Sequence, residues 1–261
     1  ACFEESAGQS LSSFALWYAQ PGTPKVSVAR TYDDKTRQLT LSLAQSLPAT
    51  SAHGEGKPVP ITLRLAAFAP DGKKLALKVE GEAASPAERI VVLEAATATL
   101  VLDDMPEGAL ISINRGFSAP VKVSTDQSVE ELATLASVDD DAYIAWDCLR
   151  SLARDTILET AQRLRKGERR PQTLSYVAAA KGAFNRHRDD PAFAAMLLQL
   201  PDLNELVFEM PDADPEALHL AREALQAVLA FELEADLISI LETPMTAAFR
   251  PDAQQAGLRA L

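Results

Sequence analysis

Histidine and cysteine, the residues that most often hold metals or act as acid, base or nucleophile, are scarce in this chain of 261 residues. The histidines are His53, His187 and His219. A zinc peptidase helix needs two histidines four positions apart, so that both rings face one metal ion, and no pair here has that spacing. His219 and Glu223 share one face of a predicted helix, but two ligands without a third are typical of a solvated surface pair. We therefore predict no metal-ligating residue.

Two kinds of glycine-containing segment resemble functional motifs and depart from them at an essential position. Residues 116–120, Gly-Phe-Ser-Ala-Pro, resemble a nucleophile elbow but carry proline in place of the second glycine. Residues 54–57, Gly-Glu-Gly-Lys, and the pair Gly72-Lys73 lack the glycine five positions before Gly-Lys that a phosphate-binding loop needs. We interpret the first segment as a strand bend and the others as loops. No catalytic residue and no cofactor-binding residue is predicted.

Acidic residues are numerous enough for acid–base catalysis, but they fall where helices are expected to begin. A carboxylate at a helix start accepts hydrogen bonds from free backbone N–H groups, so capping explains these residues without catalysis. The acidic residues in question are Asp139, Asp140, Asp141, Asp189 and Asp190. An acid–base hydrolase would require a carboxylate pair in a cleft with separated pKa values. That interpretation stays open, although no pattern favours it.

Cations cluster around Gly167, at a predicted helix end. They are Arg163, Arg165, Lys166, Arg169 and Arg170. Positive charges near the C-terminus of a helix interact favourably with its dipole, so a solvated helix end is the main interpretation. The alternative is a docking patch for an acidic surface.

The net charge of −12 is unevenly placed along the chain. Residues 1–125 hold 12 basic and 13 acidic side chains, whereas residues 126–261 hold 13 and 24. Because the acidic second half repels phosphate backbones, we predict no nucleic-acid partner. The longest apolar runs fall far short of the roughly 20 residues of a membrane helix, and no export signal is visible, so no membrane partner is expected. Cys2 and Cys148 are poorly placed for a disulfide, which favours a reducing compartment and a cytoplasmic location.

Hydrophobic periodicity predicts two fold classes in succession, all-β and then all-α. Residues 3–18 have apolar side chains at helical spacing, and a Pro-Gly-Thr-Pro turn ends that pattern. From residue 25 to residue 123 apolar residues alternate in seven or eight short runs, with Asp71-Gly72 as a hairpin signal, which predicts a β-sandwich. The expected domains are a helical tail (1–19), a β-sandwich (20–125) and a helical array (126–261).

The helical half carries start and stop signals for several helices. Asp139 or Asp140 is expected to cap a long helix that ends near Gly167. The apolar stripe of that helix comprises Ala142, Trp146, Leu149, Ala153, Ile157 and Leu164. The pairs Asp190-Pro191 and Asp214-Pro215 each place a cap before a proline at the first helical position. The last of the long helices is expected to stop at Pro244, and another begins at Asp252. Antiparallel helices with short connections predict a solenoid-like stack.

Aromatic residues gather near the two predicted domain borders, Trp17 with Tyr18 and Tyr143 with Trp146. Core packing is the expected role of such large side chains. On that basis Trp146→Ala is predicted to cost about 3 to 5 kcal/mol of unfolding free energy.

Several segments, in order, resemble bacterial aminopeptidase N over essentially the whole chain. The most specific is residues 14–24, Phe-Ala-Leu-Trp-Tyr-Ala-Gln-Pro-Gly-Thr-Pro, which is similar to the family's passage from its catalytic domain into a β-sandwich. The other matching segments are residues 45–50, 57–61, 71–72, 116–121, 141–147, 200–206, 214–215 and 221–223. Ala145, Cys148 and Arg150 depart from the family pattern, which changes packing details and one surface contact.

The resemblance implies an immunoglobulin-like sandwich that bridges a zinc-dependent catalytic domain to a helical superhelix. The parent would remove N-terminal residues from peptides, and the superhelix would limit entry to its active site. The family's Gly-Ala-Met-Glu-Asn segment and His-Glu-x-x-His helix are both absent here. No catalytic or metal residue is therefore carried over, and this chain by itself is predicted to be inactive and to hold no cofactor, with zinc bound upstream. The expected partners are the upstream catalytic domain and the parent's peptide substrates.

A freestanding binding or scaffold module is the main alternative from another functional class, because sandwiches and helical arrays both serve as interaction surfaces. The two termini distinguish these interpretations. The chain begins on a helix tail and ends on an unfinished helical array, which favours a piece of a longer protein.

Overall fold

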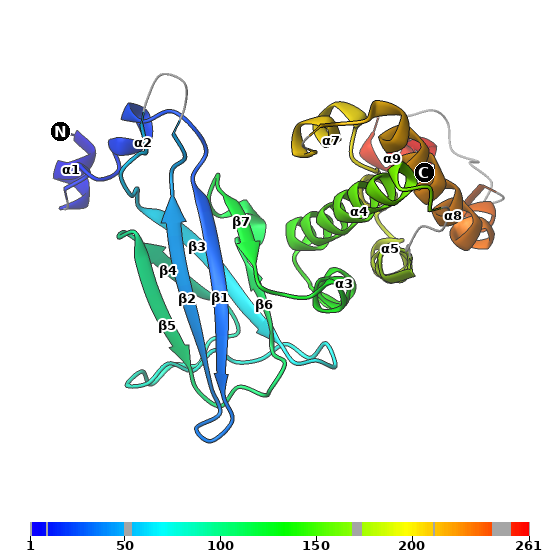
Figure 1. Cartoon of the computed structure of the whole chain (residues 1–261). Helices are drawn as coiled ribbons and strands as arrows, with labels where there is room; N and C mark the ends of the chain where they lie inside the picture. Colours follow the sequence, from blue (N-terminus) through cyan, green and yellow to red (C-terminus); the bar gives the residue numbers. More distant parts are fainter. Residues whose placement is uncertain are drawn as a thin grey trace. The chain divides into compact units, whose positions relative to one another are not determined.

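The computed structural model describes residues 2–8, 10–49, 54–168, 174–210, 212–241 and 252–260. The chain forms two compact units, Ala1–Gln127 and Ser128–Leu261 (Figure 1). Strands dominate the first unit and helices make up the second, as the change of periodicity predicted. Among the described residues, no helix combines the length and the apolar composition that crossing a membrane requires.

Seven strands in the described part of the first unit form two sheets. The four-stranded sheet has the order β5-β2-β1-β7, with β1 Lys25–Asp33, β2 Gln38–Ser46, β5 Thr97–Leu102 and β7 Lys122–Thr125. The three-stranded sheet has the order β4-β3-β6, with β3 Ile61–Phe68, β4 Arg89–Leu93 and β6 Leu110–Ile113. All pairings are antiparallel except that of β1 with β7.

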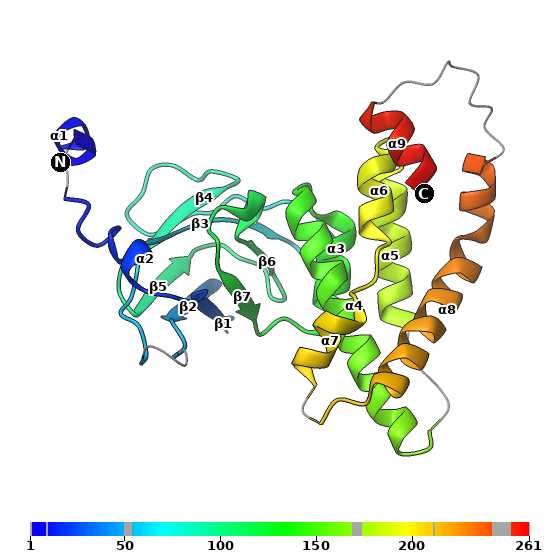
Figure 2. The ribbon, with the colours of Figure 1, turned by 90° about the horizontal axis from the view of Figure 1, so that it is seen from above.

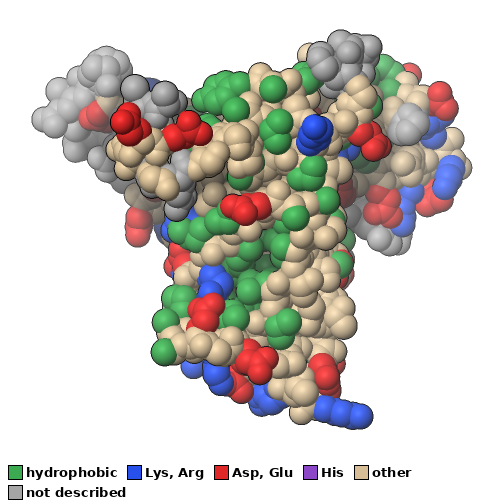
Figure 3. Space-filling model, turned by 90° about the vertical axis from the view of Figure 1, so that its left-hand side faces the viewer, with side chains coloured by type: hydrophobic (Ala, Val, Ile, Leu, Met, Phe, Trp, Pro, Cys, Tyr) green, Lys and Arg blue, Asp and Glu red, His purple; other side chains and the backbone are tan. Residues whose placement is uncertain are grey.

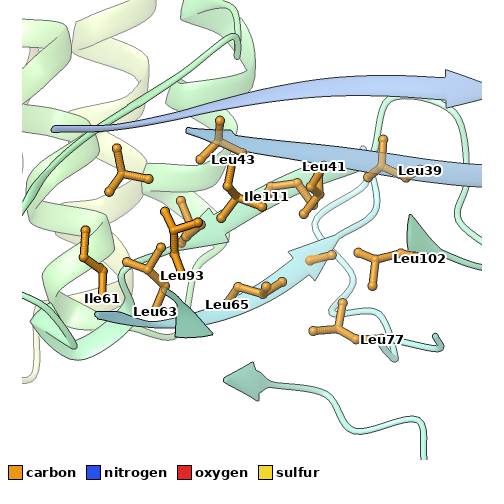
Figure 4. Close-up of a cluster of buried hydrophobic side chains, with 14 of the residues drawn as sticks. Leu39, Leu41, Leu43, Ile61, Leu63, Leu65, Leu77, Leu93, Leu102 and Ile111 are labelled. Carbon is orange, nitrogen blue, oxygen red and sulfur yellow. The ribbon is translucent and has the colours of Figure 1, made fainter. Parts of the chain in front are cut away.

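The core of the sandwich consists of the side chains that alternate inward along these strands. On β2 the inward residues are Leu39, Leu41 and Leu43, whereas Thr40 and Ser42 point to the other face. Inward residues of β3 meet them from the other sheet, and Figure 4 shows Leu63 and Leu65 in the same apolar cluster. Because each fully buried leucine contributes about 1.5 to 3 kcal/mol, the period-two pattern is enough to select this register.

The N-terminal segment differs from the single helix expected over residues 3–18. It forms two short helices, α1 Cys2–Ala7 and α2 Leu16–Ala19. Gly8 follows α1 with a φ of +63°, a left-handed conformation that ends a helix and that glycine adopts without strain. The apolar spacing that suggested one helix is therefore divided between α2 and a preceding turn.

The helical unit contains seven helices in its described residues. They are α3 Val129–Val138, α4 Ala142–Arg165, α5 Leu174–His187, α6 Pro191–Leu197, α7 Leu203–Glu209, α8 Pro215–Leu241 and α9 Ala253–Ala260. Helix α4 packs against α3 and α8, α5 packs against α3, and α6 packs against α9 (Figure 2). Small residues allow two of these close approaches: a Cβ atom at Gly182 of α5 would lie 2.6 Å from Ser137 Oγ, and one at Gly257 of α9 would lie 2.3 Å from Ala192 N.

Most predicted helix ends are confirmed, and one is corrected. Phe193 N donates to Asp190 Oδ1 and Ala217 N donates to Asp214 Oδ1, so both proline-preceding caps form. Gly167, with a φ of +80°, ends α4: its N–H donates to Leu164 O, and Glu168 N donates to Arg163 O. The expected stop at Pro244 lies outside the described residues.

The cap of α4 is Asp141, not Asp139 or Asp140 as predicted. Ile144 N donates to Asp141 Oδ1 over 3.1 Å, whereas Asp139 ends α3 and is fully buried. Asp139 Oδ1 instead accepts from Asp141 N, which closes the turn between the two helices. Three successive aspartates each satisfy the sequence rule for a cap, and the tight α3–α4 turn selects the last of them.

The corrected cap gives a stability prediction. Asp141→Ala is expected to lower the free energy of unfolding of the helical unit by about 1 kcal/mol, because one N–H group at the start of α4 loses its acceptor. The neighbouring exposed residue serves as the matched control, and Asp140→Ala is expected to change stability by less than about 0.5 kcal/mol. Urea unfolding followed by circular dichroism at 222 nm measures both. Equal losses of stability in Asp141→Ala and Asp140→Ala would contradict the assignment of the cap to Asp141.

The apolar stripe of α4 is also shifted from its predicted position. Leu149, Ala153 and Ile157 are buried as expected, but Ala142 is exposed and Trp146 is only half-buried. The additional buried residues are Ile144, Ala145, Cys148, Leu152, Thr160 and Ala161. The stripe is therefore wider than the predicted one, because α4 is covered by α3, α5 and α8 on more than one side. The apolar spacing of α8 also predicts a buried stripe. Its residues Leu218, Ala221, Leu225, Leu229 and Leu233 are buried, whereas Val228 and Leu237 are half-buried.

Candidate functional site

The segment that leads into the sandwich is held to it by polar contacts. Trp17 Nε1 donates to Pro60 O over 2.9 Å, and the indole packs against the edge of the sandwich core. Gln20 makes two hydrogen bonds with the backbone of Lys57, one to its N–H and one to its carbonyl. Tyr18, which was expected to pack in a core, is instead 85% exposed. This entry segment therefore has a defined place on the sandwich and presents one aromatic ring outward.

The segment that leaves the sandwich is anchored as well. Asp126 accepts from Arg30 twice, through the backbone N–H to Oδ2 and through Nε to Oδ1, each over 2.7 Å. The next residue, Gln127, accepts from Ile111 N over 2.7 Å. Ser128 then caps α3 in a capping box with Glu131. Sequence reasoning missed both anchors, because Arg30 and Asp126 are 96 positions apart and neither belongs to a recognisable motif.

Residues 116–120 form a tight turn in which the Ser118 hydroxyl makes hydrogen bonds that hold the turn. Asn114 adopts a φ of +68°, and its Oδ1 accepts from Ala119 N and Ser118 Oγ. Ser118 Oγ in turn accepts from Arg64 N over 2.9 Å. The turn Arg115–Phe117 is a short 3-10 helix, in place of the predicted bend within a strand. A nucleophile needs a base to take its proton, and the hydroxyl here lies between an amide side chain and a backbone N–H, so the elbow interpretation is not supported.

The other glycine-containing segments are also loops with structural contacts. Gly56 N donates to Leu47 O, and Lys57 N donates to Gln20. Gly72 N donates to Ala69 O in a tight turn after β3, which confirms the hairpin signal at Asp71-Gly72. In neither segment does a helix follow, so the N–H groups needed to cradle a phosphate do not converge.

The histidines do not come together with other ligands in the described part of the chain. His219 is exposed on α8, His187 ends α5, and His53 lies outside the described residues. Among the described residues, no group of three or more His, Cys, Asp or Glu side chains could hold a metal ion. The His187 ring meets Phe193 edge to face, with centroids 4.8 Å apart. Burial lowers the pKa of His187, Arg186 lowers it further, and Asp190 acts in the opposite direction.

The lowered pKa of His187 predicts that the stability of the helical unit depends on pH. Because the folded pKa of His187 lies below its unfolded value of about 6.5, the unfolded chain binds a proton more readily, and stability falls as pH decreases through that value. His187→Gln is expected to flatten the dependence between pH 7.5 and pH 5.5, measured as the difference in urea unfolding free energy from the unsubstituted chain. His219→Gln, at an exposed site, is the control and should leave the dependence unchanged. Identical slopes for all three proteins would contradict the assignment.

The acidity of two adjacent groups on α4, Asp147 and Cys148, is altered by burial. Burial raises the pKa of the Cys148 thiol, and the charges of Asp147 and Asp139 raise it further. A thiol in this environment stays protonated and is unreactive. Burial also raises the pKa of Asp147, against the opposing effects of Arg154 and Arg150. A single carboxyl with a raised pKa on a packed helix is not the carboxylate pair that an acid–base hydrolase requires.

Apolar side chains are exposed on the outer face of β4. Ile90 is 63% exposed and Val92 is 50% exposed, and both point away from the core side of their sheet. Figure 3 shows a face of the molecule on which hydrophobic side chains gather among scattered charged ones. Glu88 stands two positions before Ile90. It accepts hydrogen bonds from Arg64 and Lys74, and its pKa is lowered chiefly by the hydrogen bond from Lys74. Exposed apolar residues rimmed by charges are typical of surfaces that contact other protein parts.

Comparison with known proteins accounts for both units. Residues 22–126 match the domain of unknown function DUF3458, described as Ig-like, and residues 129–261 match DUF3458_C, described as ARM repeats. Aminopeptidase N of Caulobacter vibrioides is 38% identical over 265 residues, which cover 100% of this chain and 29% of that protein. Aminopeptidase N of Escherichia coli is 30% identical over 258 residues, which cover 99% of this chain and 29% of that protein.

A solved structure shows the same fold. The match to Legionella pneumophila aminopeptidase A, crystallised with aspartic acid, has a TM-score of 0.77 at 21% identity and covers 98% of this chain and 28% of that one. The chain thus spans less than a third of the length of these relatives, and the similarity extends over nearly all of it. The chain therefore belongs to the DUF3458_C family of ARM-repeat domains, preceded here by an Ig-like domain, and is homologous to part of aminopeptidase N.

Proposed function

We propose that this chain is the non-catalytic bridging and covering part of a zinc-dependent aminopeptidase N that removes N-terminal residues from peptides. The observation that carries the proposal is the match to aminopeptidase N over the full length of this chain and only 29% of the relative. In the proposed arrangement, the sandwich joins an upstream catalytic domain to a helical domain that limits access to the active site. The domain borders 1–19, 20–125 and 126–261 and a cytoplasmic location are part of the same proposal.

The contacts of the sandwich support a bridging role. Its incoming segment is fastened through Trp17 and Gln20, and its outgoing segment through Asp126 and Gln127. A domain that must hold two neighbours needs both connections fixed to its own framework, because a loose connection would not transmit position. The apolar outer face of β4 offers a surface against which another domain of the parent can pack.

The zinc chemistry is assigned to the parent and not to these residues. In the parent, zinc would polarise the scissile carbonyl and activate a water molecule. The described residues of this chain bring no three ligands together, so they do not fit a zinc site. We propose that the chain contributes no catalytic, cofactor-binding or metal-ligating residue and that its role is to position and to enclose.

The decisive first experiment is to read the coding sequence upstream of Ala1 for an in-frame His-Glu-x-x-His helix. The full protein should then release p-nitroaniline from an aminoacyl anilide, lose this activity to a chelator and regain it with zinc. This chain alone should show no zinc-dependent release. A full protein that lacks residues 128–261, and whose remaining part still unfolds cooperatively, should still cleave the anilide and should admit longer substrates. Zinc-dependent activity that stays with the purified chain would overturn the proposal.

A freestanding binding or scaffold module is the second candidate, because the exposed residues of β4 would equally suit an external protein partner. An authentic start codon immediately before Ala1 would favour it, and the peptidase proposal would then be withdrawn.

A further inference from the structure

The structure has a basic depression at the C-terminal end of α4, and its lining residues take no part in the side-chain contacts described above. It is an open depression of about 480 Å³, and the described residues that line it are Gln162, Arg165, Lys166 and Met210. This volume falls within the range of roughly 300 to 1,000 Å³ that is usual for small-ligand sites. Gln162, Arg165 and Lys166 are exposed and Met210 is buried, so two cations and an amide surround an apolar base.

Arg163 and Arg165 do not donate to the last carbonyl groups of α4 in the contacts that follow. The last carbonyl groups of α4 accept from backbone N–H groups, those of Gly167 and Glu168. Arg163 turns back along the helix to Glu159, with a separation of 2.9 Å. Arg165 Nη1 reaches away from its own helix to Asp212 O, over 3.3 Å. A guanidinium has five N–H donors, so this contact leaves donors on Arg165 for a ligand.

The two cations of the depression lie in a half of the chain, residues 126–261, whose net charge is negative. Residues 126–261 hold 24 acidic and 13 basic side chains, and five of the 13 lie between residues 163 and 170. Of these five, Arg165 and Lys166 are named among the residues that line the depression. A local positive field in an acidic unit selects small anionic groups, whereas an extended polyanion such as nucleic acid is repelled by the rest of the unit.

We propose that this depression binds a short acidic peptide segment carrying two carboxylates. Arg165 pairs with one carboxylate in the forked geometry that guanidinium and carboxylate groups share, and Lys166 pairs with the other. The Gln162 amide hydrogen-bonds to the peptide backbone, and Met210 contacts its apolar atoms. This binding is independent of the proposed peptidase role and uses only residues of the helical unit.

Titration of the 15N-labelled chain with N-acetyl-Glu-Glu-amide tests the proposal, with N-acetyl-Gln-Gln-amide as the matched uncharged peptide. The diglutamate should shift the backbone amides of Lys166, Gly167 and Met210, and the diglutamine should not. The double variant Arg165→Gln, Lys166→Gln should weaken binding about tenfold or more, because charge-assisted hydrogen bonds are removed. Arg188→Gln, which removes one exposed cation after α5, is the surface-charge control and should change affinity less than about twofold.

Four outcomes would overturn the inference. Equal shifts with both peptides would show that charge does not drive the contact. An equal loss of affinity in Arg188→Gln would show non-specific attraction to the surface. Shifts confined to residues outside the depression, or tighter binding of a single-stranded oligonucleotide to the same amides, would show that a different site or a different class of ligand is involved.

Discussion

Phe184→Ala is expected to lower the free energy of unfolding of the helical unit by about 3 to 5 kcal/mol, the usual range for emptying a fully buried aromatic site. Phe184 lies on α5 with 0% of its side chain exposed. Helix α5 packs against α3, α4, α6 and α8, so the cavity would lie where several helices meet and could collapse only partly. Urea unfolding followed by circular dichroism at 222 nm measures the loss. Trp17 fluorescence, recorded with Trp146 replaced by Phe because the chain has two tryptophans, reports on the sandwich as an internal control.

Trp146→Ala is the matched comparison within the same unit. The sequence predicted a cost of about 3 to 5 kcal/mol for this change on the assumption that Trp146 is buried. The structure corrects that expectation, because Trp146 is half-buried. Its ring centroid lies 5.9 Å from the centroid of the Tyr143 ring and 5.4 Å from Arg150 Cζ. The revised cost is about 1 to 2 kcal/mol, since only part of the ring is removed from water. Equal costs for the two substitutions would restore the original interpretation.

Gln45 is expected to be the most sensitive polar residue of the sandwich. Its side chain is buried and makes four hydrogen-bonding contacts: the two N–H groups of Nε2 are shared among Val59 O, Leu93 O and Ala95 O, and Oε1 accepts from Val59 N. These contacts connect β2 of one sheet with segments that flank β3 and β4 of the other. Gln45→Leu leaves several buried backbone groups without partners and should cost about 3 kcal/mol or more, at roughly 1 to 3 kcal/mol for each stranded group.

Gln45→Glu separates hydrogen bonding from side-chain volume. It keeps the shape but places a carboxylate oxygen where three carbonyl oxygens converge, so the cost at pH 7 should match or exceed that of Gln45→Leu. The folded pKa of the new carboxyl would lie above its unfolded value of about 4.3, so part of the loss should be recovered as pH falls toward 5. Trp17 fluorescence during urea unfolding, in a chain that also carries Trp146→Phe, measures the unfolding of the sandwich.

Gln38→Leu is the control for both changes at position 45. Gln38 is half-buried and donates one side-chain hydrogen bond, to Asp103 over 3.0 Å. Its replacement should cost less than about 1 kcal/mol. If Gln45→Leu were no more costly than Gln38→Leu, the four hydrogen bonds would not be a principal connection between the sheets.

The sequence by itself determined the features that depend on near neighbours in the chain. Apolar spacing of two and then of 3.6 residues predicted strands and then helices, and Asp190, Asp214 and Gly167 marked helix ends that the structure confirms. These signals are local, because a cap or a stripe involves residues a few positions apart. The family resemblance, carried by segments such as residues 14–24, could likewise be recognised without a structure. It is confirmed by the aminopeptidase N relatives.

Only the tertiary structure decided which residues carry the long-range contacts. The partners of Gln45 lie 14 to 50 positions away, and Arg30 meets Asp126 across 96. Which of three adjacent aspartates caps α4, and whether Trp146 or Phe184 is the buried aromatic, depend on how neighbouring helices cover each face. The basic depression likewise requires α4 to meet the residues that follow α7. No local pattern encodes these choices, because they arise when distant segments exclude water together.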